Sequence, residues 1–517
     1  MSLHSATCSL PPLSSSFRIH TLQPKDRPLR HGYSWDIADL TSDNTSFRAV
    51  DYDCNAYTAV VNTLDFKKVG VITAVKVVED PCRTNFDPAI WNANGCALNT
   101  RGRWSFWYLM EQMAGNNDPS EFILKMLETF HTTTIVNGFE LDDRPGWLGQ
   151  VINRWRSDSN CPAYVGLTDD CSLDPAFAPF RLAAIVNRMD LRPNAGSNLQ
   201  GGPYGNGIDE DTAGEGRFVF QVLGNGSPKN ASIILEYALP TTVKDRIDWA
   251  NDWLSLNLLD WNVPDGGPLS FRTKLQSITD AFVTQDIFPG RPNLGSAINT
   301  VRTNERSFDF GFSELNKQWS LRQFELGCDA GGCSVDENFL IPTPVSMTPD
   351  SSAGTSFNEQ PRDVDHLLPF INQERIAIRN GEHTVPLSFN GVDFLGGESM
   401  SNASDAQPVF WGLGIFDQID DPATALETRH LFALATCNGC HYAETENTAN
   451  MHIGVKHLGL EAPLSNFLLG YFQTSVQLDM AGTEFAEFNE PERRMCELRH
   501  TQTGAATKLS TFFGGAH

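Results

Sequence analysis

The sequence predicts an α+β fold with an N-terminal mixed α/β region, built on an antiparallel or mixed sheet, and a mostly helical C-terminal module. Three observations give this prediction. Apolar runs bounded by Gly, Asn and Pro accompany amphipathic helical segments before residue 340. The stretch 341–362 is rich in Pro, Ser and Thr and has no periodicity, which is typical of a domain boundary. Helical patterns predominate beyond it.

Length and these signals divide the chain into four parts. The chain has 517 residues, which is longer than a single domain with one hydrophobic core usually is. We expect an irregular N-terminal arm at 1–60, an α+β domain at 61–340, a linker at 341–362 and a helical module at 363–517.

Local patterns predict the individual elements. Asp118 is expected to cap a helix that has Pro119 as its first residue and Glu121 three positions after the cap. The predicted helices are 103–114, 118–133, 145–157, 242–261, 269–283, 363–381 and 423–436. The predicted strands are 67–78, 181–191, 216–224, 231–240 and 319–326, with a short β patch near 384–396.

Composition limits the function classes. The chain carries 38 basic and 63 acidic residues, a net charge of −25. This balance argues against a nucleic-acid partner, because neutralising phosphates requires clustered Lys and Arg. No run of eighteen apolar residues occurs, so we expect no membrane-spanning segment.

The eleven cysteines favour an oxidising compartment. Three pairs lie close together in loops rich in Gly, Pro or Asp: Cys82 with Cys96, Cys161 with Cys171, and Cys328 with Cys333. Two of Cys8, Cys54 and Cys496 could also pair, although sequence alone does not fix connectivity. Reduced, buried thiols in a cytosolic enzyme are the alternative. The start, MSLHSATCSLPPLSSS, is not a signal peptide as it stands. We expect a periplasmic or extracellular protein whose leader is absent from this chain.

The stretch TCNGCHYAE at 436–444 contains the strongest chemical motif. Asp421 and Pro422 are expected to start the preceding helix, which ends at the motif. Two thiols three positions apart can add to the two vinyl groups of haem, and the adjacent imidazole of His441 then lies under the iron.

A helix running into CNGCH resembles the c-type cytochromes. The resemblance covers about 20 residues closely and does not extend to 1–350. It implies haem c bound covalently by Cys437 and Cys440, with His441 as an iron ligand, in a cytochrome c-like module.

The second iron ligand stays open between two main candidates. His452 follows the motif closely and would give a bis-His site of low potential, whereas Met480 would raise the potential. We favour His452. Half of the twelve histidines lie from residue 430 onward, and the further candidates are Met451, His457, Met495 and His500.

Zinc and redox chemistry use the same cysteines. Cys437 and Cys440 with His452 or His457 and a further ligand such as Cys496 would form a tetrahedral zinc site. A second compact ligand pair is missing, which disfavours zinc. A thioredoxin-like pair requires the motif at a helix N-terminus, whereas here the helix precedes it.

Acidic side chains near residues 187–237 could hold calcium or perform acid–base work. The spacing matches no EF-hand loop, so a polar rim beside a sheet is the simpler interpretation. These residues are Asp190, Asp209, Asp211, Glu215 and Glu236.

Together these patterns predict an exported bacterial protein with a single haem, acting in electron transfer. Its large N-terminal region would bind a redox partner protein or a second copy. One alternative is a haem peroxidase or oxygenase with an open distal site. Another is a structural or assembly protein in which the CxxC pair holds a metal or a disulfide.

Overall fold

The computed structural model describes residues 46–49, 54–141, 143–166, 171–191, 212–306, 317–328, 332–349, 367–402, 419–437, 439–447 and 450–505. All of them belong to one compact unit, Ser42–His517. Both helices and antiparallel strands contribute to it, which confirms the mixed α+β class.

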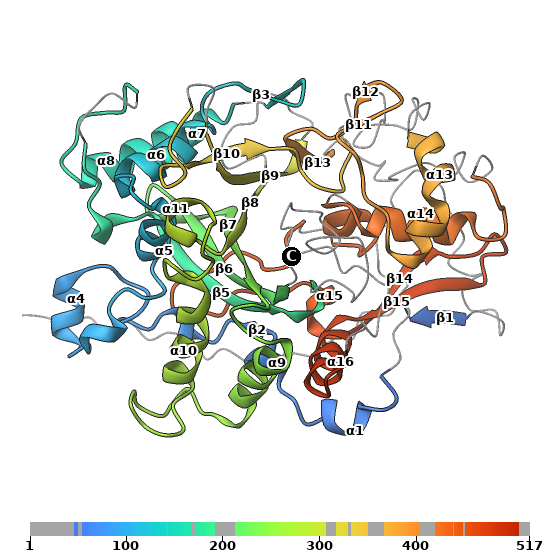
Figure 1. The fold of residues 1–517 in the computed structure, drawn as a ribbon, viewed down its shortest axis with the longest axis horizontal. Helices are drawn as coiled ribbons and strands as arrows, with labels where there is room; N and C mark the ends of the chain where they lie inside the picture. Colours follow the sequence, from blue (N-terminus) through green and yellow to red (C-terminus); the bar gives the residue numbers. More distant parts are fainter. Residues whose placement is uncertain are drawn as a thin grey trace, which may run out of the picture. The chain divides into compact units, whose positions relative to one another are not determined.

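An antiparallel sheet forms the centre of this unit, with the order β10-β9-β8-β7-β6-β5-β2 (Figure 1, green and yellow strands). Strand β13 pairs with β9 beside β10. The strands are β2 (Val71–Ile72), β5 (Phe180–Arg188), β6 (Thr212–Gly224), β7 (Ser227–Pro240), β8 (Ile298–Arg306), β9 (Lys317–Gly327), β10 (Phe339–Thr343) and β13 (Glu398–Asn402).

Helices cover one face of the sheet. Alternate residues of β6 and β7, such as Phe218 and Leu235, enter a core that also contains Trp249 and Phe282. The larger described helices are α4 (Pro88–Ala93), α5 (Phe106–Ala114), α6 (Pro119–Glu128), α8 (Asn153–Asp158), α9 (Arg246–Ser255), α10 (Phe271–Val283), α13 (Leu367–Asn380), α14 (Ala425–Leu434) and α16 (Glu490–Gln502). Short ones are α1 (Thr58–Val61), α2 (Phe66–Val69), α3 (Val75–Val78), α7 (Pro145–Trp147), α11 (Pro292–Gly295) and α15 (Asn466–Leu469).

The opposite face of the sheet packs against C-terminal segments. Val186, Val219 and Ile234 share one apolar cluster with Ile453 and Phe467. Side chains on both faces of the central strands are therefore buried. The sheet thus connects the two halves of the sequence.

Several elements cross the predicted domain boundary. Residues 341–343, assigned to the linker, belong to β10, and β13 from the C-terminal region extends the same sheet. Strand β1 (Ser46–Ala49) pairs in parallel with β15 (Glu484–Asn489), which pairs with β14 (Tyr471–Gln477). The C-terminal region thus supplies strands as well as helices. Residues 350–366, most of the linker, lie outside the described residues.

The prediction of a helix is confirmed where the sequence contains a clear N-terminal cap. The Asp118 side chain accepts a hydrogen bond from the Glu121 N–H and Pro119 is the first residue of α6, as predicted. The single strand predicted at 67–78 is wrong: Phe66–Val69 and Val75–Val78 are helical turns around the short β2. Gly70 separates the first turn from β2, so the apolar run is not continuous strand. Asp421 does not cap α14, whose N-cap is Thr424.

The three predicted cysteine pairs lie at disulfide distance, and Cys54 pairs with Cys496. Their Cα–Cα distances are 5.3–5.7 Å, within the range that disulfides require. Cys8 lies outside the described residues.

Within the described part of the chain, no helix has both the length and the apolar character to cross a bilayer. Two small hairpins complete the fold: β3 (Thr134–Val136) with β4 (Phe139–Leu141), and β11 (Ser388–Phe389) with β12 (Val392–Asp393).

Replacing both Cys54 and Cys496 by alanine is expected to lower the free energy of unfolding by about 6 kcal/mol on the chain-entropy relation, because this bridge restricts the unfolded chain over a sequence separation of 442 residues. The pair Cys328 and Cys333 is the control, since its separation is 5 residues and its removal should cost about 2 kcal/mol, a third as much. Urea unfolding monitored by tryptophan fluorescence measures both. Equal losses would contradict the chain-entropy explanation.

Candidate functional site

The CNGCH motif follows helix α14 in a tight turn. The helix ends at Leu434, and Gly439–Ala443 then forms a π-helical turn that contains Cys440 and His441. A Cβ on Gly439 would clash with the Ala433 carbonyl oxygen. The second of the two positions between the cysteines therefore requires glycine.

A buried carboxylate fastens this turn to α14. The Arg429 guanidinium donates to both oxygens of Glu444, at 2.5 and 3.2 Å, and Nδ1 of His430 lies 2.5 Å from Oε2. Burial by itself would raise the pKa of the Glu444 carboxyl, but Arg429 and His430 hold it below its usual value. Glu444 thus stays ionised, and its contacts with α14 hold in place the backbone turn that contains His441.

His441 is buried and held by a backbone acceptor. Its Nδ1 lies 2.8 Å from the carbonyl oxygen of Asn450, a residue in the left-handed region with φ 57°. A carbonyl oxygen only accepts, so Nδ1 carries the proton and Nε2 is the basic nitrogen. Burial lowers the pKa of His441 to about 4, and the ring stacks on Trp319 with centroids 4.5 Å apart. A neutral imidazole oriented by a carbonyl is the usual form of a metal-binding histidine.

His452 lies beside His441 and Cys440. Its ring centroid is 4.7 Å from that of His441, and its Nε2 is 3.7 Å from the Cys440 sulfur. Its Nδ1 is hydrogen-bonded to the Ser465 hydroxyl at 2.8 Å. The structure therefore brings the two predicted histidines together with one of the two motif cysteines.

Cys437 and Cys440 are the two described cysteines that are not in disulfides, and both are buried. Burial raises the pKa of the Cys437 thiol, and burial followed by the nearby Glu490 raises that of Cys440 well above its usual value. Reactive redox cysteines have lowered pKa values and are accessible. This environment disfavours the thioredoxin-like alternative.

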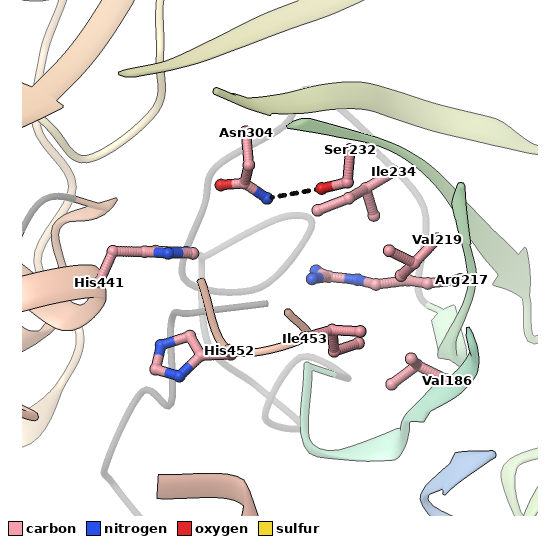
Figure 2. Close-up of a pocket in the computed structure, with 9 residues that line it drawn as sticks. All are labelled: Val186, Arg217, Val219, Ser232, Ile234, Asn304, His441, His452 and Ile453. Carbon is pink, nitrogen blue, oxygen red and sulfur yellow. Dashed lines mark hydrogen bonds between the residues drawn. The ribbon is translucent and has the colours of Figure 1, made fainter. Parts of the chain in front are cut away.

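A cavity of about 20 Å³, with room for about one water molecule, separates the motif from the sheet. Figure 2 shows the His441 ring and the Arg217 guanidinium pointing toward each other across it, with the His452 ring beside His441. Its lining on the sheet side mixes apolar and polar residues in equal number. The remaining lining residues are Val186, Val219, Ser232, Ile234, Asn304 and Ile453.

Buried charges lie on the same sheet face. The Glu236 carboxylate is 3.2 Å from Nη1 of Arg217 and 3.1 Å from Nη1 of Arg302, and it accepts from the Thr300 hydroxyl at 2.6 Å. Arg217, Arg302 and Thr300 were missed from the sequence, because a polar or charged residue in a strand normally indicates a solvent-facing position. The sequence did contain one signal: the strands that carry these residues also have apolar residues at the alternate positions, as expected of a sheet covered on both faces.

The acidic residues considered for calcium are paired with arginine where they are described. Asp190 pairs with Arg188, and Glu215 and Glu236 pair with Arg217. Carboxylates neutralised in this way are poor calcium ligands. Asp209 and Asp211 lie outside the described residues.

Other candidate ligands lie elsewhere. Met480 is 57% exposed in the turn between β14 and β15, and His457 is also exposed. Cys496 is bonded to Cys54, so its sulfur is not a thiolate ligand for zinc. The structure therefore does not bring Met480, His457 or Cys496 to the cavity lining.

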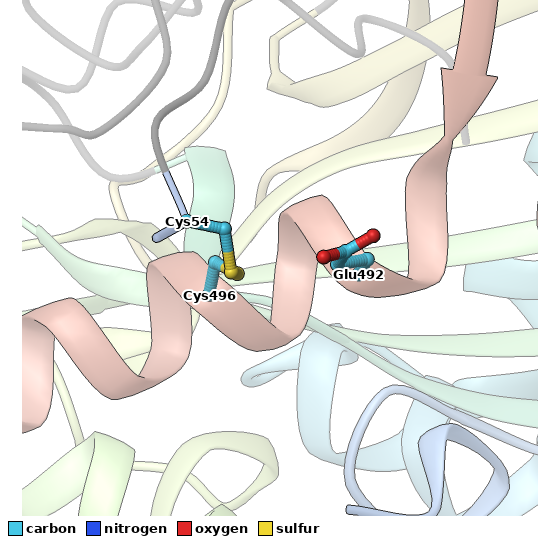
Figure 3. A group of neighbouring side chains, drawn as sticks. All are labelled: Cys54, Glu492 and Cys496. Atoms are coloured by element: carbon cyan, nitrogen blue, oxygen red, sulfur yellow. A yellow bond between two sulfur atoms is a disulfide. The ribbon is translucent and has the colours of Figure 1, made fainter. Parts of the chain in front are cut away.

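Cys54, Cys496 and Glu492 form the one group of potential metal ligands found among the described residues (Figure 3). The disulfide uses both sulfurs. Glu492 and Asn489 form a reciprocal helix cap: the Asn489 side chain accepts from the Glu492 N–H at 3.3 Å and donates to the Glu492 carboxylate at 2.6 Å. This group therefore has a structural explanation.

Comparison with known proteins gives no further guide to the chemistry of this site. No family model, no curated protein and no solved structure matches this chain.

Proposed function

We propose that this chain carries one haem bound covalently by Cys437 and Cys440, with His441 as an iron ligand, and that it transfers electrons in an exported bacterial protein. The observation that carries the proposal is the state of the cysteines. Eight of the ten described cysteines form disulfides, whereas the CNGCH pair stays unpaired and buried beside a neutral histidine.

The donor set fits haem c. The two thiols lie in apolar clusters, Cys437 with Trp319 and Cys440 with Val186 and Val219, as vinyl groups would need. His441 has its Nδ1 proton committed to the Asn450 carbonyl, which leaves Nε2 as the ligating nitrogen. The cavity has room for about one water molecule and does not admit haem as it stands, so the segments on either side of it must move apart for haem to bind.

His452 is the better proposal for the second ligand, because Met480 is at the surface. With haem bound, His441 and His452 would hold the iron; their ring centroids are 4.7 Å apart in this structure, so both side chains would have to shift for the cofactor to enter. Bound there, haem supplies one-electron redox chemistry. The protein positions its ligands and excludes water.

The remaining features agree with this role. A helix that leads directly into CNGCH supports a cytochrome c-like arrangement of 425–443. The disulfides are compatible with the periplasm or another extracellular location. We propose that the N-terminal region presents a surface for a redox partner or for a second copy of the chain.

One observation favours the peroxidase alternative. Arg217 is directed into the cavity (Figure 2), where a guanidinium can stabilise negative charge that develops on a leaving oxygen. Carbon monoxide or peroxide binding at rates typical of an open iron site would support this reading, and a closed six-coordinate spectrum would support electron transfer.

Expression with periplasmic maturation tests the haem proposal. We expect a Soret band and a haem stain that survives denaturing electrophoresis. The double variant Cys437→Ala, Cys440→Ala should lose the stain, and Cys328→Ala, Cys333→Ala should keep it. A colourless protein with stoichiometric zinc and no iron would overturn the proposal.

A further inference from the structure

Cys328 and Cys333 form the most accessible of the four described disulfides. Both residues of this pair are exposed, Cys328 directly after β9 and Cys333 in the segment that follows. The residues of the other three pairs are all buried or half-buried. In thiol–disulfide exchange a thiolate must reach a disulfide sulfur. An external thiol can therefore attack this pair most readily while the chain stays folded.

An amide oxygen lies beside both sulfurs of this pair. Asn338 is buried, and its Oδ1 lies 3.2 Å from the Cys328 sulfur and 2.8 Å from the Cys333 sulfur. A disulfide has no proton to donate to this oxygen, whereas each thiol that reduction forms has one. Reduction of the pair therefore gains a hydrogen-bond acceptor that is already in place.

A strained turn lies next to the segment that begins at Cys333. Asn293 and Leu294, within α11, both have left-handed backbone angles, with φ 53° and 57°. Because this conformation brings the Cβ close to the carbonyl oxygen, it is costly for any residue other than glycine. Two such residues in succession persist only where the surrounding structure holds them.

Residues 333–338 hold this turn in place. The Asn293 side chain accepts a hydrogen bond from the Asn338 N–H and donates one to the Asn338 carbonyl oxygen, both at 2.8 Å. The Leu294 N–H donates to the Asp336 carboxylate at 2.9 Å. The disulfide anchors the start of this segment covalently. The strained turn therefore depends on a segment whose anchor is the accessible disulfide.

We propose that the Cys328–Cys333 disulfide is a redox switch, which a dithiol reductant opens and whose opening releases the turn at Asn293 and Leu294. A thiolate of the reductant attacks one sulfur and forms a mixed disulfide with it, and the other cysteine leaves as a thiolate. The second thiol of the reductant then displaces the bound cysteine. Two electrons and two protons thus pass to the pair, which ends as two thiols, and the reductant leaves as its own disulfide.

Opening the disulfide removes the covalent anchor of residues 333–338, so these residues hold the turn less firmly and its backbone relaxes. The switch is independent of the haem proposal, because neither Cys328 nor Cys333 belongs to the CNGCH motif or lines the cavity beside it.

Trapping the full chain during reduction by dithiothreitol without denaturant tests the first step. Samples are quenched with N-ethylmaleimide at intervals, and the labelled cysteines are identified by mass spectrometry. We expect Cys328 and Cys333 to be labelled about tenfold faster than the cysteines of the other three disulfides, because their sulfurs are the most accessible. Equal or slower labelling of this pair would overturn the proposal.

Hydrogen exchange of the peptide that covers residues 286–295 tests the second step. Reduction should make its amides exchange about tenfold faster, since the restraint of a short disulfide loop is lost. The double variant Cys328→Ser, Cys333→Ser should exchange at the fast rate both before and after dithiothreitol is added.

The double variant Cys161→Ser, Cys171→Ser is the matched control, because it removes another local disulfide. Its 286–295 peptide should exchange slowly until dithiothreitol is added. The switch is excluded if reduction leaves the exchange of this peptide unchanged, or if dithiothreitol still accelerates it in the Cys328→Ser, Cys333→Ser variant.

Discussion

Between pH 7 and pH 5 the haem-free protein should lose about 4 kcal/mol of unfolding free energy, because two buried histidines resist protonation. Burial lowers the pKa of His383 to about 3 and that of His441 to about 4, from an ordinary value of 6.5. Below pH 6.5 the unfolded chain binds protons at both positions and the folded chain does not. Stability therefore rises with pH across this window and is fully present above pH 6.5.

Urea unfolding at a series of pH values measures this dependence. His383→Leu should remove about half of the loss, roughly 2 kcal/mol, because one of the two depressed groups is gone. His457→Gln is the matched control, since that side chain is exposed, and it should leave the pH profile unchanged. A profile that is flat between pH 7 and pH 5 would show that the imidazoles are not kept neutral by burial.

Replacing Glu444 by leucine should destabilise the protein by about 3–5 kcal/mol, because it leaves the buried Arg429 without its carboxylate. The same change releases the turn that carries His441, so the variant should also attach less haem in a periplasm. Because the folded pKa of Glu444 is lowered, its contribution to stability is present above about pH 4.5 and is lost as the pH falls below that value.

Glu446→Gln is the matched control for Glu444. Glu446 lies two residues further along and accepts hydrogen bonds from Ser475, at 2.6 Å from the backbone nitrogen and 2.5 Å from the hydroxyl, which glutamine can also accept. Its replacement should change stability by less than about 1 kcal/mol. Similar losses in both variants would show that the ion pair with Arg429 contributes nothing specific to the turn.

The elements that sequence predicted well are those with local causes. The cap and first turn of α6, at Asp118 and Pro119, depend on residues within four positions of each other. The strands around Phe218 and Ile234 are likewise apolar runs with clear ends. The 67–78 segment failed because an apolar β-branched run does not by itself distinguish a strand from two buried helical turns.

The candidate site likewise contains residues that the sequence located and residues that only the structure revealed. CNGCH is contiguous, so its two thiols and its imidazole could be located from sequence, and the nearby His452 was identified as a candidate. Arg217 and Trp319 could not be found, because they come from strands more than one hundred residues away and reach the motif only when the sheet packs on it.

The sequence by itself indicated several of the helices and strands, the three short cysteine pairs as candidates and the motif at 437–441, because each depends on the spacing of neighbouring residues. Only the tertiary structure decided that the predicted α+β domain and C-terminal module share one sheet, that Cys496 pairs with Cys54, and that five described arginines are buried in ion pairs on one side of that sheet. The physical reason is that burial and charge compensation are properties of contacts between distant segments, and a single sequence does not specify which distant segments meet.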